Sequence, residues 1–174
     1  MAEPTELRKA TLTDLAGLLD LSVTTFYPAF APLNTEENMR EYMDRAFSEE
    51  QLAKELADPD CMFYLTYMDD RPCGYLKLNF APAQTDLNDT DSLEVQRIYV
   101  LPEFQGLGIG EQMVQKAISV AAEHRLKYIW LGVWEKNPGA IRFYRRHGFV
   151  VAGSHPFPFG DEIQTDLIMK LVLE

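Results

Sequence analysis

The sequence predicts a single α/β domain in which helices flank a mixed, mostly antiparallel sheet. Residues 61–68 and 73–80 are two apolar runs joined by the polar turn 69–72, a pattern typical of an antiparallel hairpin. Two further predicted strands, 93–101 and 127–134, are each followed by a helix, as in α/β proteins. The 174 residues suit one domain with one sizeable core.

A short strand over 6–10 and a helix that starts near Thr11 are the first predicted elements. Asp14 lies three residues after Thr11, so the two residues can form a capping box. From Leu15 to Val23 the leucines and the valine recur at helical spacing, which predicts one buried helix face.

Two more helices are predicted before the hairpin. Asn34, with Glu37 three residues later, is the expected cap of the first, and Ser48, with Gln51, is the expected cap of the second. The segment 34–60 holds nine acidic and three basic side chains, so it supplies −6 of the chain's net charge of −11.

The second half of the chain is predicted to alternate strands and helices before a closing pair of strands. Pro138 just inside a helix start and Gly148 just past its end are the usual order of these two residues. The expected elements are a polar connection over 82–92, a strand over 93–101 ending at Pro102, a helix over 108–123, a strand over 127–134, a helix from Asn137-Pro138 to Gly148, and strands over about 149–157 and 163–172.

The composition excludes several classes of function. With 16 Lys and Arg against 27 Asp and Glu, the chain is a poor match for nucleic acid or for anionic membrane surfaces, which are bound through basic side chains. No apolar run approaches the roughly 18 residues of a membrane helix, and no export signal is visible. Cys61 and Cys73 do not make a disulfide framework, because the hairpin register places them at opposite ends of the ladder. We therefore expect a cytoplasmic protein.

No metal site is expected, because His124, His147 and His155 lack ligand spacing among themselves or with the cysteines.

The most informative stretch runs from Gln105 to Gly110 and reads QGLGIG. It lies between a predicted strand and a predicted helix. Glycines at alternate positions let the chain turn sharply and let backbone N–H groups approach an anion. The N-terminus of the following helix adds free N–H groups and a positive dipole end, which suit a pyrophosphate. The spacing matches neither a P-loop nor the dinucleotide fingerprint.

Two segments resemble the GNAT superfamily of N-acetyltransferases. They read LEVQRIYVLPEFQGLGIG and, about thirty residues later, NPGAIRFYRRHGF. The family's coenzyme A loop, Q/R-x-x-G-x-G/A, is matched by Gln105, Gly108 and Gly110. The stretches FYPAF, ENMREY, WLGVWEKN and GDEIQTDLIM are similar to the PaiA-type polyamine acetyltransferases, whose substrates are spermidine and spermine.

The resemblance implies acetyl-CoA as co-substrate, with no metal. It also implies a sheet that splays between Glu94–Val100 and the strand 127–134, with the coenzyme wedged in the gap. The expected coenzyme-binding residues are Ile98, Tyr99 and Val100 beside pantetheine, Gln105, Gly106, Leu107, Gly108, Ile109, Gly110 and Glu111 around the pyrophosphate, and Asn137 and Tyr144.

Direct transfer from acetyl-CoA requires a proton acceptor for the amine and a proton donor for the departing thiolate. A primary amine of pKa about 10.4 lies about three units above neutral pH, so its deprotonation costs about 4 kcal/mol. Glu94 is the expected base, at a position where the family often has one, and Tyr144 is the expected acid.

Both assignments have structural alternatives. Glu94 could be a surface strand residue or an ion-pair partner of Arg97, although strand alternation places Glu94 with Gln96 on one face and Val95 with Arg97 on the other. Tyr144 could be a core aromatic residue.

Separated carboxylates and aromatic faces would suit a small polycationic amine such as spermidine or spermine. The candidate acceptor-binding residues are Tyr27, Glu36, Glu37, Glu41, Asp161, Glu162 and Asp166, although a helical charge run is usually a solvated face. A protein N-terminus, a lysine or an antibiotic amine is an alternative acceptor. A regulatory protein that senses acetyl-CoA without turnover is an alternative function. A homodimer is implied by the resemblance alone.

Overall fold

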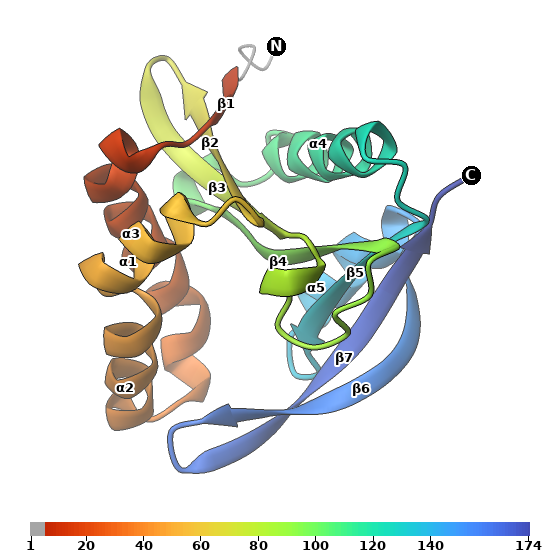
Figure 1. The fold of residues 1–174 in the computed structure, drawn as a ribbon. Helices are drawn as coiled ribbons and strands as arrows, with labels where there is room; N and C mark the ends of the chain where they lie inside the picture. The colour runs from red at the N-terminus through yellow and green to blue at the C-terminus, as the bar shows by residue number, and fades with distance from the viewer. Residues whose placement is uncertain (1–5) are drawn as a thin grey trace.

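The computed structural model describes residues 6–174, which form a seven-stranded sheet with helices on both faces (Figure 1). The strand order across the sheet is β1-β2-β3-β4-β5-β7-β6. The strands are β1 (Glu6–Lys9), β2 (Cys61–Met68), β3 (Arg71–Asn79), β4 (Ser92–Val100), β5 (Tyr128–Trp134), β6 (Val150–Phe159) and β7 (Glu162–Val172). The helices are α1 (Leu15–Phe30), α2 (Glu36–Ala46), α3 (Glu49–Ala57), α4 (Ile109–Glu123) and α5 (Pro138–Arg146).

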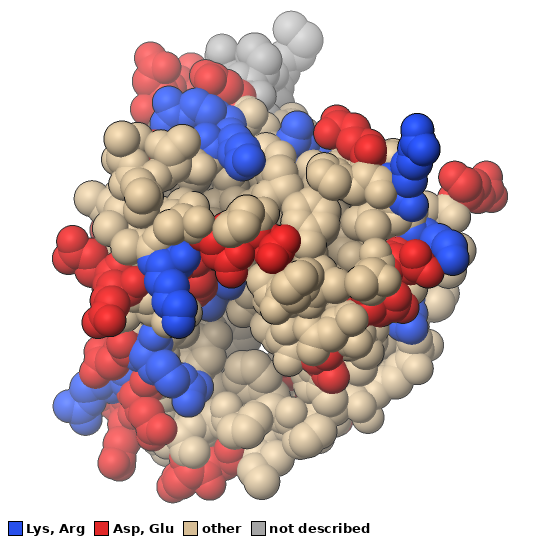
Figure 2. Space-filling model, in the orientation of Figure 1, with Lys and Arg blue, Asp and Glu red and all other residues tan. Residues whose placement is uncertain are grey.

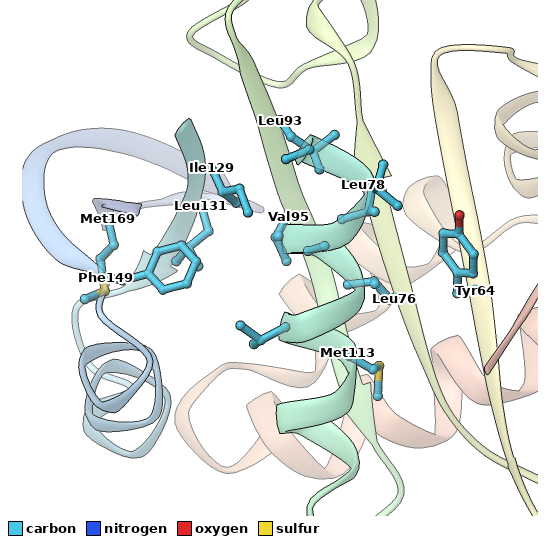
Figure 3. Close-up of a cluster of buried hydrophobic side chains, with 14 of the residues drawn as sticks. Tyr64, Leu76, Leu78, Leu93, Val95, Met113, Ile129, Leu131, Phe149 and Met169 are labelled. Carbon is cyan, nitrogen blue, oxygen red and sulfur yellow. The ribbon is translucent and has the colours of Figure 1, made fainter. Parts of the chain in front are cut away.

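Two apolar layers hold the helices against the sheet. On one face, α4 packs on β3, β4 and β5, and its Met113 belongs to the same apolar cluster as Leu76 and Leu78 (Figure 3). On the other face, α1 and α3 pack on β2 and β3 around Phe63 and Tyr75. In Figure 1, α1, α2 and α3 stand together on the left and α4 lies at the upper right, so the sheet is covered from both sides.

The order of helices and strands expected from the sequence is confirmed. Two of the expected helix-capping contacts are also formed. The backbone N–H of Thr11 donates to Asp14 Oδ2 at 2.9 Å, and the Ser48 hydroxyl accepts from the N–H of Gln51 at 3.1 Å. Cys61 and Cys73 are free thiols, because the β2–β3 register pairs Cys61 with Asn79 at one end of the hairpin.

The expectation that Asn34 caps α2 was wrong. Thr35 is the cap, since its hydroxyl accepts from the N–H of Asn38 at 3.2 Å. A short 3-10 turn over Ala31–Leu33 uses the N–H of Asn34, which shifts the helix start by one residue. The Asn34 side chain instead donates to the carbonyl of Phe30 at 2.8 Å and accepts from Gln164 at 2.7 Å.

The sheet splits between its two central strands, as the resemblance implied. β4 and β5 run parallel but pair only over Ser92–Glu94 and Tyr128–Trp130. Beyond Glu94 the remaining residues of β4 pair with β3 alone, while β5 continues to pair with β7. The facing edges of β4 and β5 therefore diverge from a vertex at Glu94 and Trp130.

A β-bulge in β4 overturns the expected alternation of its side chains. The register with β3 passes from Lys77 opposite Arg97 to Leu78 opposite Val95, which leaves Gln96 as the extra residue. Beyond the bulge, the side chains of β4 alternate in the opposite sense to that expected from the sequence. Val95 joins the core under α4, whereas Glu94 and Arg97 both face the side of α1 and α3.

We predict that Leu78→Ala lowers the free energy of unfolding by about 2–5 kcal/mol, because Leu78 is fully buried between β3 and α4 and its truncation leaves a cavity. Urea unfolding followed by circular dichroism measures the change. Leu33→Ala is the matched control, since Leu33 is 60% exposed and its loss should change stability by less than about 0.5 kcal/mol. Equal effects of the two substitutions would contradict the assignment of the core.

Candidate active site

The divergence of β4 and β5 opens into a cavity of about 940 Å³. Its walls come from both central strands, from α1 and α5, and from the β6–β7 hairpin, which reaches across to α2 (Figure 1). The cavity continues along β4 from Glu94 to Tyr99 and ends beside Gln105. It therefore joins the vertex of the split sheet to the glycine-rich loop.

The glycine-rich loop adopts the conformation that its sequence requires. Gly106 and Gly108 have φ of +80° and +83°, in the left-handed region that favours glycine, and Gly108 is the N-cap residue of α4. Gln105 holds the loop against the strand end by donating to the carbonyl of Val100 at 3.1 Å. A Cβ at Gly110 would lie 3.1 Å from the Phe143 ring, so this glycine lets α4 approach α5 closely.

Two polar side chains of the α5 segment line the cavity. Asn137 caps the helix by accepting from the N–H of Ala140 at 3.2 Å, and it lines the cavity as well. Tyr144 lies one helical turn beyond Ala140 and packs edge-on against Phe143 and Phe149, with ring centroids 5.3 and 5.7 Å away. Burial raises the pKa of Tyr144, so its phenol stays protonated and can donate a hydrogen bond at neutral pH.

Glu94 lies at the vertex with both carboxylate oxygens occupied. Oε1 accepts from Asn79 Nδ2 at 2.9 Å and from the N–H of Thr85 at 2.9 Å, while Oε2 accepts from the Thr85 hydroxyl at 2.5 Å. The residue is 2% exposed and lines the cavity. Three donors therefore fix the position of one carboxylate at the vertex.

Arg97 pairs with Glu55, and the alternative of a Glu94–Arg97 ion pair does not occur within residues 6–174. Arg97 Nη1 lies 3.7 Å from Glu55 Oε1, and the same oxygen accepts from Lys77 at 2.5 Å. The guanidinium of Arg97 also stacks over the Phe47 ring at 4.8 Å. Burial lowers the pKa of Lys77. This buried trio anchors α3 to β3 and β4 on the helix side of the cavity.

A histidine between two aspartates lines the opposite wall of the cavity. His155 Nδ1 lies 2.5 Å from Asp86 Oδ2, and His155 Nε2 lies 3.7 Å from Asp166 Oδ2. His155 and Asp166 are direct cross-strand partners in the β6–β7 ladder. Burial raises the pKa of Asp166, and His155 opposes that rise.

Sequence reasoning missed His155, Asp86 and Thr85 as cavity residues. His155 was considered only for metal spacing, and Asp86 and Thr85 belong to the polar connection that precedes β4. His155 and Asp86, which form a hydrogen bond with each other, are 69 positions apart in the sequence. The only available signal was the placement of His155 on a predicted strand next to the strand of Asp166.

Seven of the predicted site residues line the cavity. Candidates from β4, from the glycine-rich loop and from the α5 segment therefore meet in one space. The seven residues are Glu94, Ile98, Tyr99, Gln105, Asn137, Tyr144 and Asp166. The remaining coenzyme candidates lie in the adjoining strand end, loop and first turn of α4, and they are Val100, Gly106, Leu107, Gly108, Ile109, Gly110 and Glu111.

The other acceptor candidates do not line the cavity. They are Tyr27, Glu36, Glu37, Glu41, Asp161 and Glu162. The glutamates of α2 are exposed because Asn38 and Met39 form the buried side of that helix. Figure 2 shows acidic and basic side chains interspersed over the helices at the left of the molecule. Asp161 accepts from Asn38 Nδ2 at 2.8 Å and so ties the tip of the β6–β7 hairpin to α2.

An aromatic wall, also missed by sequence reasoning, closes the cavity between α1, α2 and the hairpin. Tyr42 stacks between Phe26 and Phe159, with centroid distances of 4.8 and 5.2 Å. Phe30 and Phe157 extend this wall along the cavity.

Within residues 6–174 no helix is long and apolar enough to cross a membrane. Nor does that part of the chain contain a group of three or more His, Cys, Asp or Glu side chains suited to a metal ion.

Comparisons with known proteins point to one family. The model of the acetyltransferase (GNAT) family matches residues 23–149. An uncharacterized N-acetyltransferase of Lactobacillus delbrueckii subsp. lactis is 36% identical over 160 residues, which cover 92% of each chain. A spermine/spermidine N(1)-acetyltransferase of Bacillus subtilis is 27% identical over 133 residues, or 74% of this chain and 84% of that one.

The fold is also similar to that of a solved acetyltransferase. The crystal structure of the PaiA N-acetyltransferase from Thermoplasma acidophilum, in complex with coenzyme A, superposes with a TM-score of 0.82. The superposition covers 98% of this chain and 100% of that one, at 22% sequence identity.

We predict that Asp166→Asn increases stability relative to the wild type by an amount that grows with pH. Because the folded-state pKa of Asp166 is raised above its ordinary value of 3.8, ionisation of this carboxyl destabilises the native state as pH rises through the interval between the two values. The asparagine variant lacks that loss. Urea unfolding at several pH values between about 4 and 7 measures the difference.

Asp44→Asn, at an exposed position of α2, is the control, with an expected change of less than about 0.5 kcal/mol. A stability difference for Asp166→Asn that stays flat or shrinks as pH rises would be inconsistent with the burial of an ionised carboxylate.

Proposed function

Because the chain belongs to the acetyltransferase (GNAT) family, we propose that it transfers the acetyl group of acetyl-CoA to a polyamine such as spermidine or spermine. N-acetyl transfer is the activity of the family, and acetyl-CoA is the donor that the family uses. The choice of a polyamine is supported by the chemistry of the cavity and by the names of two relatives, a spermidine N(1)-acetyltransferase and a spermine/spermidine N(1)-acetyltransferase.

The coenzyme half of the cavity suits coenzyme A. The left-handed glycines 106 and 108 turn the chain so that the first N–H groups of α4, which have no partner within a helix, can bind phosphate oxygens. The edge of β4 beyond Glu94 is not paired with β5, so Ile98 to Val100 can offer backbone groups to pantetheine as an added strand does. Asn137 and Tyr144 face the same gap.

The acceptor half carries the observation on which the polyamine proposal rests. Three carboxylates, Asp86, Glu94 and Asp166, line the cavity together with one guanidinium, Arg97, which shares Glu55 with Lys77. The aromatic wall lies in the same space. A flexible chain with several ammonium groups matches separated carboxylates, and aromatic faces attract cations by about 0.5–2 kcal/mol each.

The acidic side chains of α2 have a different place in this proposal. Glu36, Glu37 and Glu41 lie outside the cavity, so we assign them to the long-range field that attracts a polycation and not to contact with it. The homodimer is proposed on the family resemblance alone.

The chemistry is proposed as direct attack in a ternary complex. Neither Cys61 nor Cys73 is among the cavity residues, so an acetyl-cysteine intermediate has no nucleophile there. The amine attacks the thioester carbonyl, the C–N bond forms and the C–S bond breaks. The phenol of Tyr144, which burial keeps protonated by raising its pKa, hydrogen-bonds the leaving thiolate and passes it a proton while taking one from the nitrogen of the new amide.

A coenzyme A release assay across amines tests the proposal. We expect turnover on spermidine and spermine to exceed that on diamines, aminoglycosides and N-terminal peptides by at least about tenfold in kcat/KM, because only the polyamines place several cations among the cavity carboxylates. Faster turnover on a peptide or an aminoglycoside would contradict the polyamine as acceptor and would leave the membership of the acetyltransferase family unchanged. Binding of acetyl-CoA without turnover on any amine would favour a sensor of acetyl-CoA.

Tyr144→Phe should lower kcat by about 10²–10⁴, because the thiolate then leaves without a proton donor, while the Kd for acetyl-CoA stays within about twofold. Stopped-flow turnover and calorimetric titration measure the two quantities. Tyr128→Phe is the matched control, since Tyr128 lies on β5 outside the cavity and bonds to Asp89. Unchanged turnover in Tyr144→Phe would remove this residue from the acid role.

A further inference from the structure

We propose that His155, held between Asp86 and Asp166, is the proton acceptor that converts the bound ammonium group into the attacking amine. The proposal rests on the proposed function and assigns to a histidine of the β6–β7 hairpin a task that sequence reasoning assigned to Glu94. The acceptor can be any primary amine that the cavity admits, with spermidine as the probe.

Glu94 is poorly placed to collect a proton. Its two oxygens already accept three hydrogen bonds, from Asn79 and from the N–H and hydroxyl of Thr85. A carboxylate has about four acceptor positions, so these donors leave only one of them, on Oε2, open to the substrate. Glu94 thus acts as a fixed negative charge at the vertex of the split strands.

His155 has the opposite arrangement, with one nitrogen held and one available. Nδ1 is bonded to Asp86 Oδ2 at 2.5 Å, which orients the ring and places the N–H on that side. Nε2 lies 3.7 Å from Asp166 Oδ2, beyond hydrogen-bond distance, so its lone pair can accept from a donor in the cavity. When Nε2 takes a proton, both aspartates stabilise the imidazolium, as the aspartate of a catalytic triad does.

The surroundings of His155 leave space for an amine. A Cβ at Gly132 of β5 would lie 3.6 Å from the His155 ring and 3.4 Å from Asp166 Oδ2. Because glycine has no side chain, the space next to both groups stays open to the cavity. Gly132 lies two residues beyond Trp130, where β5 has just separated from β4. The imidazole therefore borders the gap where β4 and the coenzyme-facing residues meet.

The proton balance is closed without another reactant. The ammonium group of the acceptor gives one proton to His155 Nε2, and the neutral amine forms the C–N bond as the C–S bond breaks. Tyr144 gives its proton to the thiolate and recovers one from the nitrogen of the new amide. His155 releases its proton to water, so each turnover yields the acetylated amine, coenzyme A and one proton.

The experiment compares His155→Gln with the wild-type chain across pH, with acetyl-CoA and spermidine. Glutamine keeps a polar group near Asp86 but takes no proton in this range. We expect kcat/KM to fall about 10²–10³-fold near pH 7.5. The deficit should shrink towards pH 10, because the neutral fraction of a primary amine rises about tenfold per pH unit below its pKa.

The titratable groups facing His155 are Asp86 and Asp166, and Glu94 lines the same cavity. None of the three is changed in the variant. His124→Gln is the matched control, since His124 is exposed at the end of α4 and lies outside the cavity. Its kcat/KM should stay within about twofold of the wild type at every pH.

Asp86→Asn gives a second variant on a more exposed side chain. It should show a smaller deficit with the same trend in pH, because the ring loses a stabilising charge but keeps its nitrogen. Added imidazole should raise the activity of His155→Ala several-fold and leave the wild type unchanged.

The outcomes separate this inference from the proposed function. Wild-type turnover on spermidine tests the function alone. If the wild type prefers a peptide amine, the same pH comparison on that peptide still tests His155. A deficit that is constant across pH, or no deficit, would overturn the role of His155 and leave the acetyltransferase intact.

Discussion

The early end of the β4–β5 ladder is the constraint on which the site depends. Two parallel strands at the centre of a sheet normally pair along their length, yet these two stop after three residue pairs. The strands can separate because each keeps a full antiparallel partner, β3 for β4 and β7 for β5. The apolar core under α4 holds the vertex together, and the cavity occupies the space that a longer ladder would fill (Figure 3).

The bulge at Gln96 decides which charged side chains of β4 lie on the same face of the sheet. By inserting one residue, it places Glu94 and Arg97 on the same face of β4 while Val95 still reaches the core. Each of these charged groups is then held by its own neighbours, Glu94 by Thr85 and Asn79, and Arg97 by Glu55. Fixed charges of this kind do not need to reorganise when a charged substrate enters.

Sequence alone predicted the position of those candidate residues that belong to one local pattern. The glycine loop at 105–110 and Tyr144 on its capped helix were recognisable because each is a local pattern. The set of cavity carboxylates was predicted only in part: Glu94 and Asp166 were among the candidates, but Asp86 was missed because it lies in a polar connection, while the densest run of acids, on α2, points to solvent. Nor can alternation alone reveal the extra residue of a bulge such as Gln96. Charge density along a chain does not give the position of that charge in space.

The hairpin tip over the cavity is secured differently from its base. Side-chain contacts join it to the helical layer: hydrogen bonds of Asn38 with Asp161 and of Asn34 with Gln164, and the stacking of Tyr42 on the buried Phe159 ring. Such contacts can break one at a time, whereas a strand ladder opens cooperatively. The tip is therefore held by contacts that can open one by one, whereas the vertex and the core are held by ladders and close packing.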